Sequence, residues 1–300
     1  MQSPIGMIPD LAAHLVDAGG KRLRPMITLA TSQMLGVSGD KPIKLATAVE
    51  FIHSATLLHD DIVDGSELRR GKTAANRLWG NSASILVGDF LFARSFSLMV
   101  ETGHLGVLDI LSKASAVIAE GEVHQLSVIG NVDLPINEYM TIIEAKTAEL
   151  FAAAASVSAV IATGSEQQQQ ALDKFGRSLG LAFQLIDDAL DYSGHDDLLG
   201  KQIGDDFREG KLTLPVFITY NKADTEAKNW WQQVLSAETR NDDDLAKAID
   251  LINQSGAIED TLSQAHKFAL QAQASLEIFS DSPIRNCLMD LCDFLVQRRS

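Results

Sequence analysis

Apolar residues recur along most of the chain at the spacing of an α-helix rather than with the alternation of a β-strand. In the stretch 44–64 the positions near 3.6-residue spacing are Leu45, Val49, Ile52, Thr56 and Ile62. This spacing puts them on one face of a helix, which can pack against a core. A further helix is expected to begin at 165, because the run 165–168 reads Ser-Glu-Gln-Gln and has the form of a capping box.

Prolines are sparse: there are seven, and they leave proline-free stretches at 43–134, 136–214 and 216–282. These stretches are rich in Ala, Leu, Gln and Glu, which favour helix. No change in composition marks a linker, and no repeat of fixed period is visible. We therefore expect an all-α protein with one domain that spans residues 1–300.

Charge narrows the choice of partners. The chain has 40 Asp and Glu against 25 Lys and Arg, a net charge of −15, and 46% hydrophobic residues. The hydrophobic content is typical of a soluble globular protein with a core. The excess of negative charge repels phosphate backbones, so we expect no nucleic-acid partner.

Signals for export or membrane insertion are also weak. The first six residues lack the basic and apolar regions of a secretory signal. The most apolar run, 151–163, is shorter than the roughly twenty residues that a membrane span needs. The two cysteines, Cys287 and Cys292, have no metal-ligand spacing and suggest a reducing compartment. The sequence therefore predicts a cytoplasmic protein without a transmembrane segment.

Two acidic clusters of the form D-D-x-x-D stand out, at 60–64 and 187–191. Each follows an apolar helical approach, and on a helix the first and last Asp of each cluster lie on one face. Carboxylate oxygens of this kind suit Mg²⁺, which commonly bridges one or two carboxylates to substrate phosphates. The alternative for a single cluster is a solvated acidic helix end, as at 242–244. Two copies on apolar helices favour a metal site.

Basic residues are just as unevenly placed. Three cations fall within 21–24, the run 69–72 contains three more, and Lys201 and Lys211 bracket a Gly-Asp-Asp sequence at 204–206. Arginine can hold phosphate oxygens in a bidentate fork. Any one of these groups alone would more often be a surface patch. Together with the acidic clusters, they indicate two diphosphates bound side by side.

These motifs resemble, in order and spacing, the trans-prenyl diphosphate synthases. The likeness runs from about residue 19 to 220 and is carried by Gly19 to Pro25, His53 to Asp64, Arg69 to Gly71, Gly88-Asp89, Gly121-Glu122, Lys146-Thr147, Phe183 to Asp188 and Gly204 to Lys211. The resemblance is strongest to the bacterial long-chain octaprenyl and decaprenyl (all-trans-polyprenyl) diphosphate synthases of quinone side-chain synthesis. The chain departs in one respect: 18 residues precede Gly19, fewer than such enzymes usually carry.

The resemblance implies a fold and an activity. The fold would be a single large helical bundle of the isoprenoid synthase type with a central apolar cavity. The activity would be that of a Mg²⁺-dependent prenyltransferase that condenses isopentenyl diphosphate onto an allylic diphosphate such as farnesyl diphosphate. The product would be a long chain for quinones such as ubiquinone. The family also implies a homodimer.

The resemblance assigns roles to residues as well. Mg²⁺ would be bound by Asp60, Asp64 and Asp187, and the two acidic clusters would be completed by Asp61, Asp188 and Asp191. Isopentenyl diphosphate would be held by Lys21, Arg24, His53 and Arg70. The allylic diphosphate and its reacting end would be met by Arg69, Lys146, Thr147, Gln184, Lys201 and Lys211.

Product length would depend on the residues about one turn before Asp60, because the growing chain must run from the acidic cluster down the same helix. Those residues, Ala55 and Thr56, are small, whereas short-chain relatives usually place an aromatic ring near there. The bland alternative is that both are close-packing positions between helices.

Three other functions compete with a long-chain synthase. A shorter-chain geranylgeranyl or farnesyl diphosphate synthase would share every motif. A terpene cyclase also ionises a diphosphate, but it normally has one D-D-x-x-D and needs no isopentenyl site. A non-catalytic partner subunit of a heteromeric synthase would have decayed motifs, whereas all six cluster aspartates are intact here.

Overall fold

The computed structural model describes residues 3–193, 203–237 and 239–297 of the 300-residue chain. The described residues are mostly helical, in the order α1 (Met7–Asp17), α2 (Leu23–Met34), α3 (Lys41–Val63), α4 (Ala75–Trp79), α5 (Asn81–Glu101), α6 (Leu105–Val128), α7 (Ile136–Ile143), the π-helix η1 (Glu144–Ala148), α8 (Glu149–Ile161), α9 (Glu166–Leu190), α10 (Asp205–Arg208), α11 (Leu214–Lys222), α12 (Thr225–Leu235), α13 (Asp242–Ser255), α14 (Ala257–Ser275) and α15 (Pro283–Gln297). Two-residue strands β1 (Leu68–Arg69) and β2 (Lys72–Thr73) pair antiparallel after α3. The all-α fold predicted from the sequence is confirmed.

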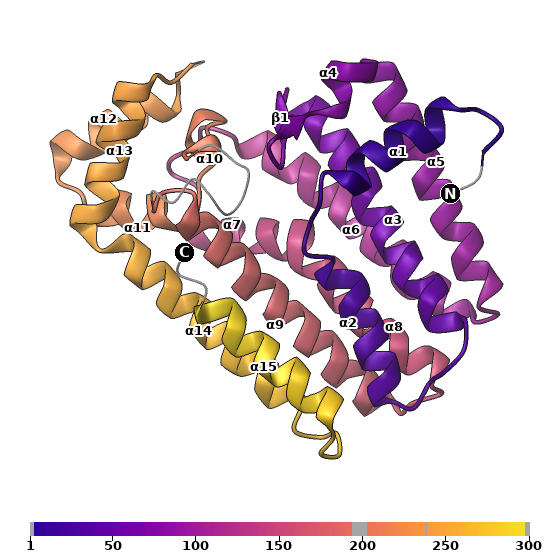
Figure 1. The fold of residues 1–300 in the computed structure, drawn as a ribbon. Coiled ribbons are helices and arrows are strands. Elements are labelled where there is room, and N and C mark those ends of the chain that lie inside the picture. The colour runs from indigo at the N-terminus through magenta and orange to yellow at the C-terminus, as the bar shows by residue number, and fades with distance from the viewer. Residues whose placement is uncertain (1–2, 194–202, 238, 298–300) are drawn as a thin grey trace.

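The helices pack around α8 and α9. α9 packs along α8 on one side and along α14 on another, and both α2 and α6 contact α8. α3 packs mainly along α5. Figure 1 shows α9, α14 and α15 running side by side, with α11, α12 and α13 gathered at one end of the molecule.

Small residues allow α8 and α9 to approach closely. α8 buries nearly all of its residues, including the four alanines at 152–155. On α9, a Cβ on Gly180 would lie 2.6 Å from the Cα of Ala148, and a Cβ on Gly176 would overlap the carbonyl of Phe151. Glycine at these two positions therefore brings α9 against the start of α8 and the end of η1.

Both helices predicted from the sequence pattern are present. α3 begins a few residues earlier than the periodicity indicates, with Pro42 in its first turn, where a missing N–H costs little. α9 is opened by the predicted capping box: the amide of Gln168 donates to Ser165 Oγ at 3.2 Å, and the amide of Ser165 donates to Gln168 Oε1 at 2.9 Å. The single domain over residues 1–300 stays a prediction.

α5 has the length and composition of a helix that could cross a membrane, with a mean hydropathy of 1.5 over its most apolar stretch. The core helices of soluble proteins can pass the same test. Here 33% of that stretch is buried inside the molecule, and α5 leaves Ile85, Leu86 and Val100 exposed. The absence of a transmembrane segment therefore stays a prediction.

Candidate active site

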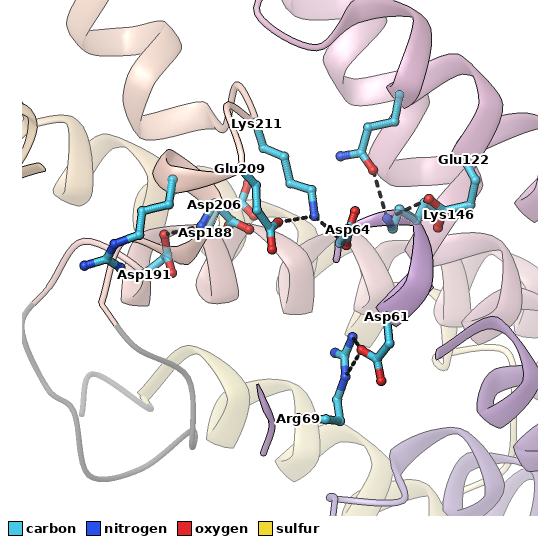
Figure 2. Close-up of polar contacts among 12 residues, drawn as sticks. Asp61, Asp64, Arg69, Glu122, Lys146, Asp188, Asp191, Asp206, Glu209 and Lys211 are labelled. Carbon is cyan, nitrogen blue, oxygen red and sulfur yellow. Dashed lines mark hydrogen bonds and ion pairs between the residues drawn. The ribbon is translucent and has the colours of Figure 1, made fainter. Parts of the chain in front are cut away.

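Two adjoining cavities of about 600 and 190 Å³ lie between the C-terminal ends of α3 and α9. Polar side chains that line both are Asp60, Asp64, Arg69, Lys146, Thr147, Gln184, Asp187, Asp206 and Lys211. The larger cavity extends to Lys21, Arg24, His53 and Arg70. Residues far apart in the sequence thus line one continuous site, and Figure 2 shows Lys211 between Glu209 and Asp64, and Lys146 beside Glu122.

The first acidic cluster divides between the cavity and the protein interior. Asp60 and Asp64 line the cavity, as their spacing predicts, and Asp64 Oδ2 lies 3.0 Å from Lys211 Nζ (Figure 2). Asp61 is buried and accepts two hydrogen bonds from Arg69, one of them from Nε at 2.8 Å. Asp61 therefore fixes the guanidinium of Arg69.

Asp60 carries the strongest electrostatic conflict of this cluster. Burial, and after it the carboxylates of Glu122 and Asp64, raise the pKa of Asp60 to about 7 against the opposing effect of Lys146. A carboxylate in this environment needs additional positive charge to be fully ionised at neutral pH.

In the second acidic cluster, Asp187 lines both cavities and Asp188 is buried beneath it. Asp188 accepts hydrogen bonds from Tyr139 Oη and, at 2.8 Å, from Gln184 Nε2. Burial and the carboxylate of Asp206 raise the pKa of Asp188 to about 7. Asp188 thus anchors Gln184 from behind.

Asp191 lies outside the set of described residues that line the cavities. Asp191 is the C-cap of α9, and its amide donates to the carbonyl of Asp187 at 3.0 Å, so it keeps the i, i+4 position that the sequence predicts. Its carbonyl accepts from the amide of Gly204 at 2.9 Å, and its carboxylate accepts from the amide of Asp206 at 3.2 Å. Asp191 therefore holds the loop that presents Asp206.

Another part of the lining of the larger cavity, here called the cationic wall, is cationic and aromatic. Arg24 Nη1 lies 3.3 Å from His53 Nε2, and its guanidinium lies 4.3 Å from the ring centre of Phe151. Lys21 Nζ lies 5.2 Å from the ring centre of Phe183. Burial and then the charge of Arg24 lower the pKa of His53 well below its usual value, so the imidazole is neutral at pH 7. Burial lowers the pKa of Arg24 to about 10.

Backbone conformation places two further arginines. Arg22 and Arg70 have φ values of 51° and 54°, in the left-handed region that non-glycine residues rarely adopt. Arg22 pairs with Glu50, and Arg70 donates to the carbonyl of Gly19. A Cβ on Gly20 would overlap the guanidinium of Arg70, so the glycine makes room for it.

Hydrogen bonds connect η1 to α6 and to α9. Lys146 Nζ donates to Glu122 Oε2 at 2.7 Å and to Gln125 Oε1 at 2.8 Å (Figure 2). Thr147 Oγ1 donates to Gln184 Oε1 at 2.8 Å. The predicted residues Lys146, Thr147 and Gln184 therefore meet at the junction of the two cavities. Of the two predicted lysines beyond α9, Lys211 reaches the site, and Lys201 lies outside the described residues.

The two residues predicted to control product length are separated by the fold. Thr56 lines the larger cavity, and its Oγ1 donates to the carbonyl of His53 at 2.8 Å. Ala55 is buried in a hydrophobic cluster with Leu58 and Val87. A product that grows within the larger cavity would therefore contact Thr56, whereas one that grows between α3 and α5 would contact Ala55.

Comparisons with known proteins agree with this geometry. The model of the polyprenyl synthetase family matches residues 6–252. The chain is 42% identical to an octaprenyl diphosphate synthase of Escherichia coli, an alignment that covers 99% of this chain and 92% of that protein.

The chain belongs to the polyprenyl synthetase family. Solved structures of similar proteins include a polyprenyl synthase from Caulobacter crescentus complexed with calcium and isoprenyl diphosphate, at 51% identity and a TM-score of 0.97 over 100% of this chain and 92% of that one. A decaprenyl diphosphate synthase from Rhodobacter capsulatus matches at 47% identity and a TM-score of 0.95, over 100% and 93%. The resemblance inferred from the sequence is confirmed, and so is the expectation of an enzyme, a trans-prenyltransferase.

The donor set fits a magnesium site of the kind predicted. Asp60 and Asp64 from α3 and Asp187 from α9 line both cavities and supply only oxygen ligands. In the described part of the chain, no three His, Cys, Asp or Glu side chains converge into a ready-made metal cage. Mg²⁺ commonly uses one or two carboxylates and completes its coordination with water and substrate phosphates. Such a site needs the diphosphate as well as the aspartates.

Several functional contacts were not assigned from the sequence. Glu122 and Gln125 hold Lys146, Tyr139 holds Asp188, and Asp206 lines both cavities. Glu122 belongs to the Gly121-Glu122 motif of the family resemblance, which assigned it no role. Tyr139 lies 49 residues from its partner, so its contact has no local signal in the sequence.

Asp60→Asn separates the electrostatic cost of this carboxylate from its use. Because the folded-state pKa is raised, ionisation of Asp60 costs stability as the pH rises from about 4 to about 7. At pH 8 we expect the free energy of unfolding of the metal-free variant to exceed that of the wild type by on the order of 1 kcal/mol or more, so that it unfolds at a higher temperature. Near pH 4 the two should match. Turnover should fall by orders of magnitude, because a carboxylate that would hold Mg²⁺ is lost.

The control is Asp290→Asn, which removes an exposed carboxylate on α15. Thermal unfolding and turnover are measured for both variants. An Asp60→Asn enzyme that is less stable at pH 8, or nearly as active as the wild type, would contradict the assignment.

Proposed function

We propose that the protein is a cytoplasmic, Mg²⁺-dependent all-trans-polyprenyl diphosphate synthase that adds isopentenyl diphosphate to an allylic diphosphate such as farnesyl diphosphate. The long-chain product would serve quinone side chains such as that of ubiquinone. One observation carries the proposal: two acidic helix ends face a separate cationic pocket across one cavity. Relatives named octaprenyl and decaprenyl diphosphate synthases, and the neighbour complexed with calcium and isoprenyl diphosphate, support it.

The cationic pocket suits the diphosphate of isopentenyl diphosphate. Arg24 Nε is buried and has no hydrogen-bond partner among the described residues. A buried guanidinium N–H without a partner is costly, and a phosphate oxygen would satisfy it. The neutral imidazole of His53 adds a donor or acceptor without repelling Arg24, and Lys21 and Arg70 border the same space.

The acidic side suits the allylic diphosphate. Asp60, Asp64 and Asp187 would hold Mg²⁺, which when bound neutralises charge on the departing diphosphate. Arg69, held by Asp61, and Lys211, paired with Asp64, already bring cations to this wall. Together they favour cleavage of the allylic C–O bond, with the electron pair leaving on the diphosphate.

The remaining chemistry belongs to the substrates. The isopentenyl double bond attacks the allylic carbon, and a proton leaves, in our proposal to the released diphosphate. Thr147 and Gln184 lie at the cavity junction, where the oxygen atoms of η1 and α9 can stabilise positive charge and the side chains exclude water. Lys146, itself a cation, is held there by Glu122 and Gln125. No side chain needs to act as a nucleophile.

Incubation with labelled isopentenyl diphosphate, farnesyl diphosphate and Mg²⁺, followed by chromatography of the lipid products, tests the proposal. Long all-trans chains are expected. Products that end after one or two additions would identify a shorter-chain synthase, and cyclic hydrocarbons without use of isopentenyl diphosphate would identify a terpene cyclase. No product without another subunit would identify a non-catalytic partner.

Arg24→Ala and Arg69→Ala should affect different substrates. Loss of Arg24 removes a charged hydrogen-bond donor from the cationic pocket, so the KM for isopentenyl diphosphate should rise about 10- to 100-fold. Loss of Arg69, which lies beside Asp60 and Asp64, should act on the allylic substrate. Steady-state kinetics with each substrate varied in turn measures both effects. The same pattern in both variants would contradict this division of the site.

Thr56→Tyr should shorten the product. Thr56 lies one turn before Asp60 on the cavity wall, so a rigid ring there would block the way along α3 and stop growth after the first one or two condensations. In Ala55→Tyr the ring must fit between α3 and α5, at an overpacking cost of roughly 1–3 kcal/mol. Product sizing and thermal unfolding are measured for both. A product shortened by Ala55→Tyr alone would place the path on the other side of α3.

We also propose that the protein is a homodimer. Exposed large apolar side chains on α5 and α6 include Leu86 and Val123, each 67% exposed, and such surfaces commonly mark interfaces. Sedimentation should give twice the chain mass of 32.5 kDa, and Leu86→Glu should reduce it to that of one chain. Leu270→Glu, at an exposed leucine on α14, is the control. A monomeric wild type would refute the proposal.

A further inference from the structure

The π-helix η1 occupies a critical place in the site. It interrupts the regular helices between α7 and α8, and it carries Lys146 and Thr147. A π-turn adds a residue to a helical turn and so changes the direction of the side chains on it, often at functional sites. Because π-helical turns are rare, a single one inside an α-helix is expected to depend on the contacts around it.

Two glycines, one on α6 and one on α9, allow these helices to pack closely against η1. A Cβ on Gly121 of α6 would lie 2.8 Å from Ala145 Cβ and 3.2 Å from the amide nitrogen of Lys146. A Cβ on Gly180 of α9 would lie 2.6 Å from Ala148 Cα. α6 and α9 therefore touch the backbone of the turn directly.

Arg177, one turn before Gly180 on α9, connects the two ends of η1. Its Nη1 lies 3.2 Å from Glu144 Oε1 and 2.7 Å from Glu149 Oε2. Glu144 is the first residue of η1, and Glu149 is the first residue after it. Arg177 Nε also lies 3.3 Å from Asp173 Oδ2, one turn earlier on α9. One guanidinium thus spans the whole π-turn.

Arg177 is outside the set of described residues that line the two cavities. Any effect on the reaction must therefore pass through the turn that it holds. A side chain with no more than a surface role would contribute little to stability through such ion pairs and nothing to turnover.

We propose that Arg177 is a positioning residue: by tying Glu144 to Glu149 it fixes η1 and aims Lys146 and Thr147 at the reacting end of the allylic substrate. The inference rests on the proposed function for the role of those two residues. A misplacement of about 1 Å in a catalytic group can cost about 100-fold in rate. Loss of Arg177 should therefore lower kcat by about 10- to 100-fold.

Arg177→Met tests this, because methionine keeps an apolar stem of similar reach and removes the charge. The matched control is Arg285→Met on α15, where the arginine side chain is 18% exposed, against 28% for Arg177, and donates to the carbonyl of Leu276 at 3.1 Å. We expect a lower kcat in Arg177→Met with an unchanged KM for isopentenyl diphosphate, whose pocket is built on α2 and α3. Arg177→Lys should restore part of kcat, since one cation can still meet Glu149.

A second readout does not depend on catalysis. Hydrogen exchange of the backbone amides at 145–148 should be faster in Arg177→Met than in the wild type, and unchanged in Arg285→Met. A double variant of Arg177→Met and Glu149→Gln should lose little more than either single variant, because both break one network.

The outcomes separate this inference from the proposed function. A wild type that makes no prenyl product would refute the proposed function, and hydrogen exchange would still test the hold on η1. An active wild type with equal kcat per folded molecule in Arg177→Met and Arg285→Met would overturn the inference. Unchanged exchange at 145–148 in Arg177→Met would overturn it as well.

Discussion

The main constraint on this structure is the repulsion among carboxylates that are gathered at one partly buried site. α3 and α9 bring the ends of two acidic clusters to the same cavity, and Asp206 joins them from the loop after α9. Burial raises the pKa of Asp60 and Asp188, and the neighbouring carboxylates raise it as well. The fold accommodates this by giving neighbouring carboxylates separate partners: Arg69 for Asp61, Lys211 for Asp64, and Tyr139 with Gln184 for Asp188.

The helical scaffold makes this arrangement rigid. α8 is built from small residues, and Gly176 and Gly180 let α9 lie directly on its backbone. Because the helices meet at backbone distance, the side chains at their ends have little freedom to move apart when they repel. The same close packing fixes Gln184, which must accept from Thr147 and donate to Asp188 at once. Tight packing between helices is therefore a condition for the electrostatics of the cavity.

Sequence reasoning succeeded where local geometry decides position. The i, i+4 argument placed Asp60 and Asp64 on one wall, and the capping box at Ser165 marked the start of α9. The same argument holds for the backbone of Asp191, but its carboxylate accepts from the amide of Asp206 and does not line the cavities, because the loop after Gly204 folds back onto it. The family resemblance brought in Lys146 and Thr147, which no periodicity would have singled out. Contacts such as Tyr139 with Asp188, or the π-turn itself, arise from tertiary packing and carry no local pattern.

The cationic wall, like the acidic one, contains features that are unfavourable in the protein by itself. Arg22 and Arg70 occupy left-handed backbone conformations, which non-glycine residues adopt at some cost and which cluster at functional sites. Arg24 is buried against Phe151 with one donor unsatisfied, and His53 beside it is held neutral. The acidic wall therefore carries excess negative charge, and the cationic wall carries one buried donor without an acceptor among the described residues, Arg24 Nε. In the proposed function, divalent metal would relieve the acidic wall and a diphosphate the cationic wall, so the two substrates would complete an electrostatic balance that the polypeptide leaves open.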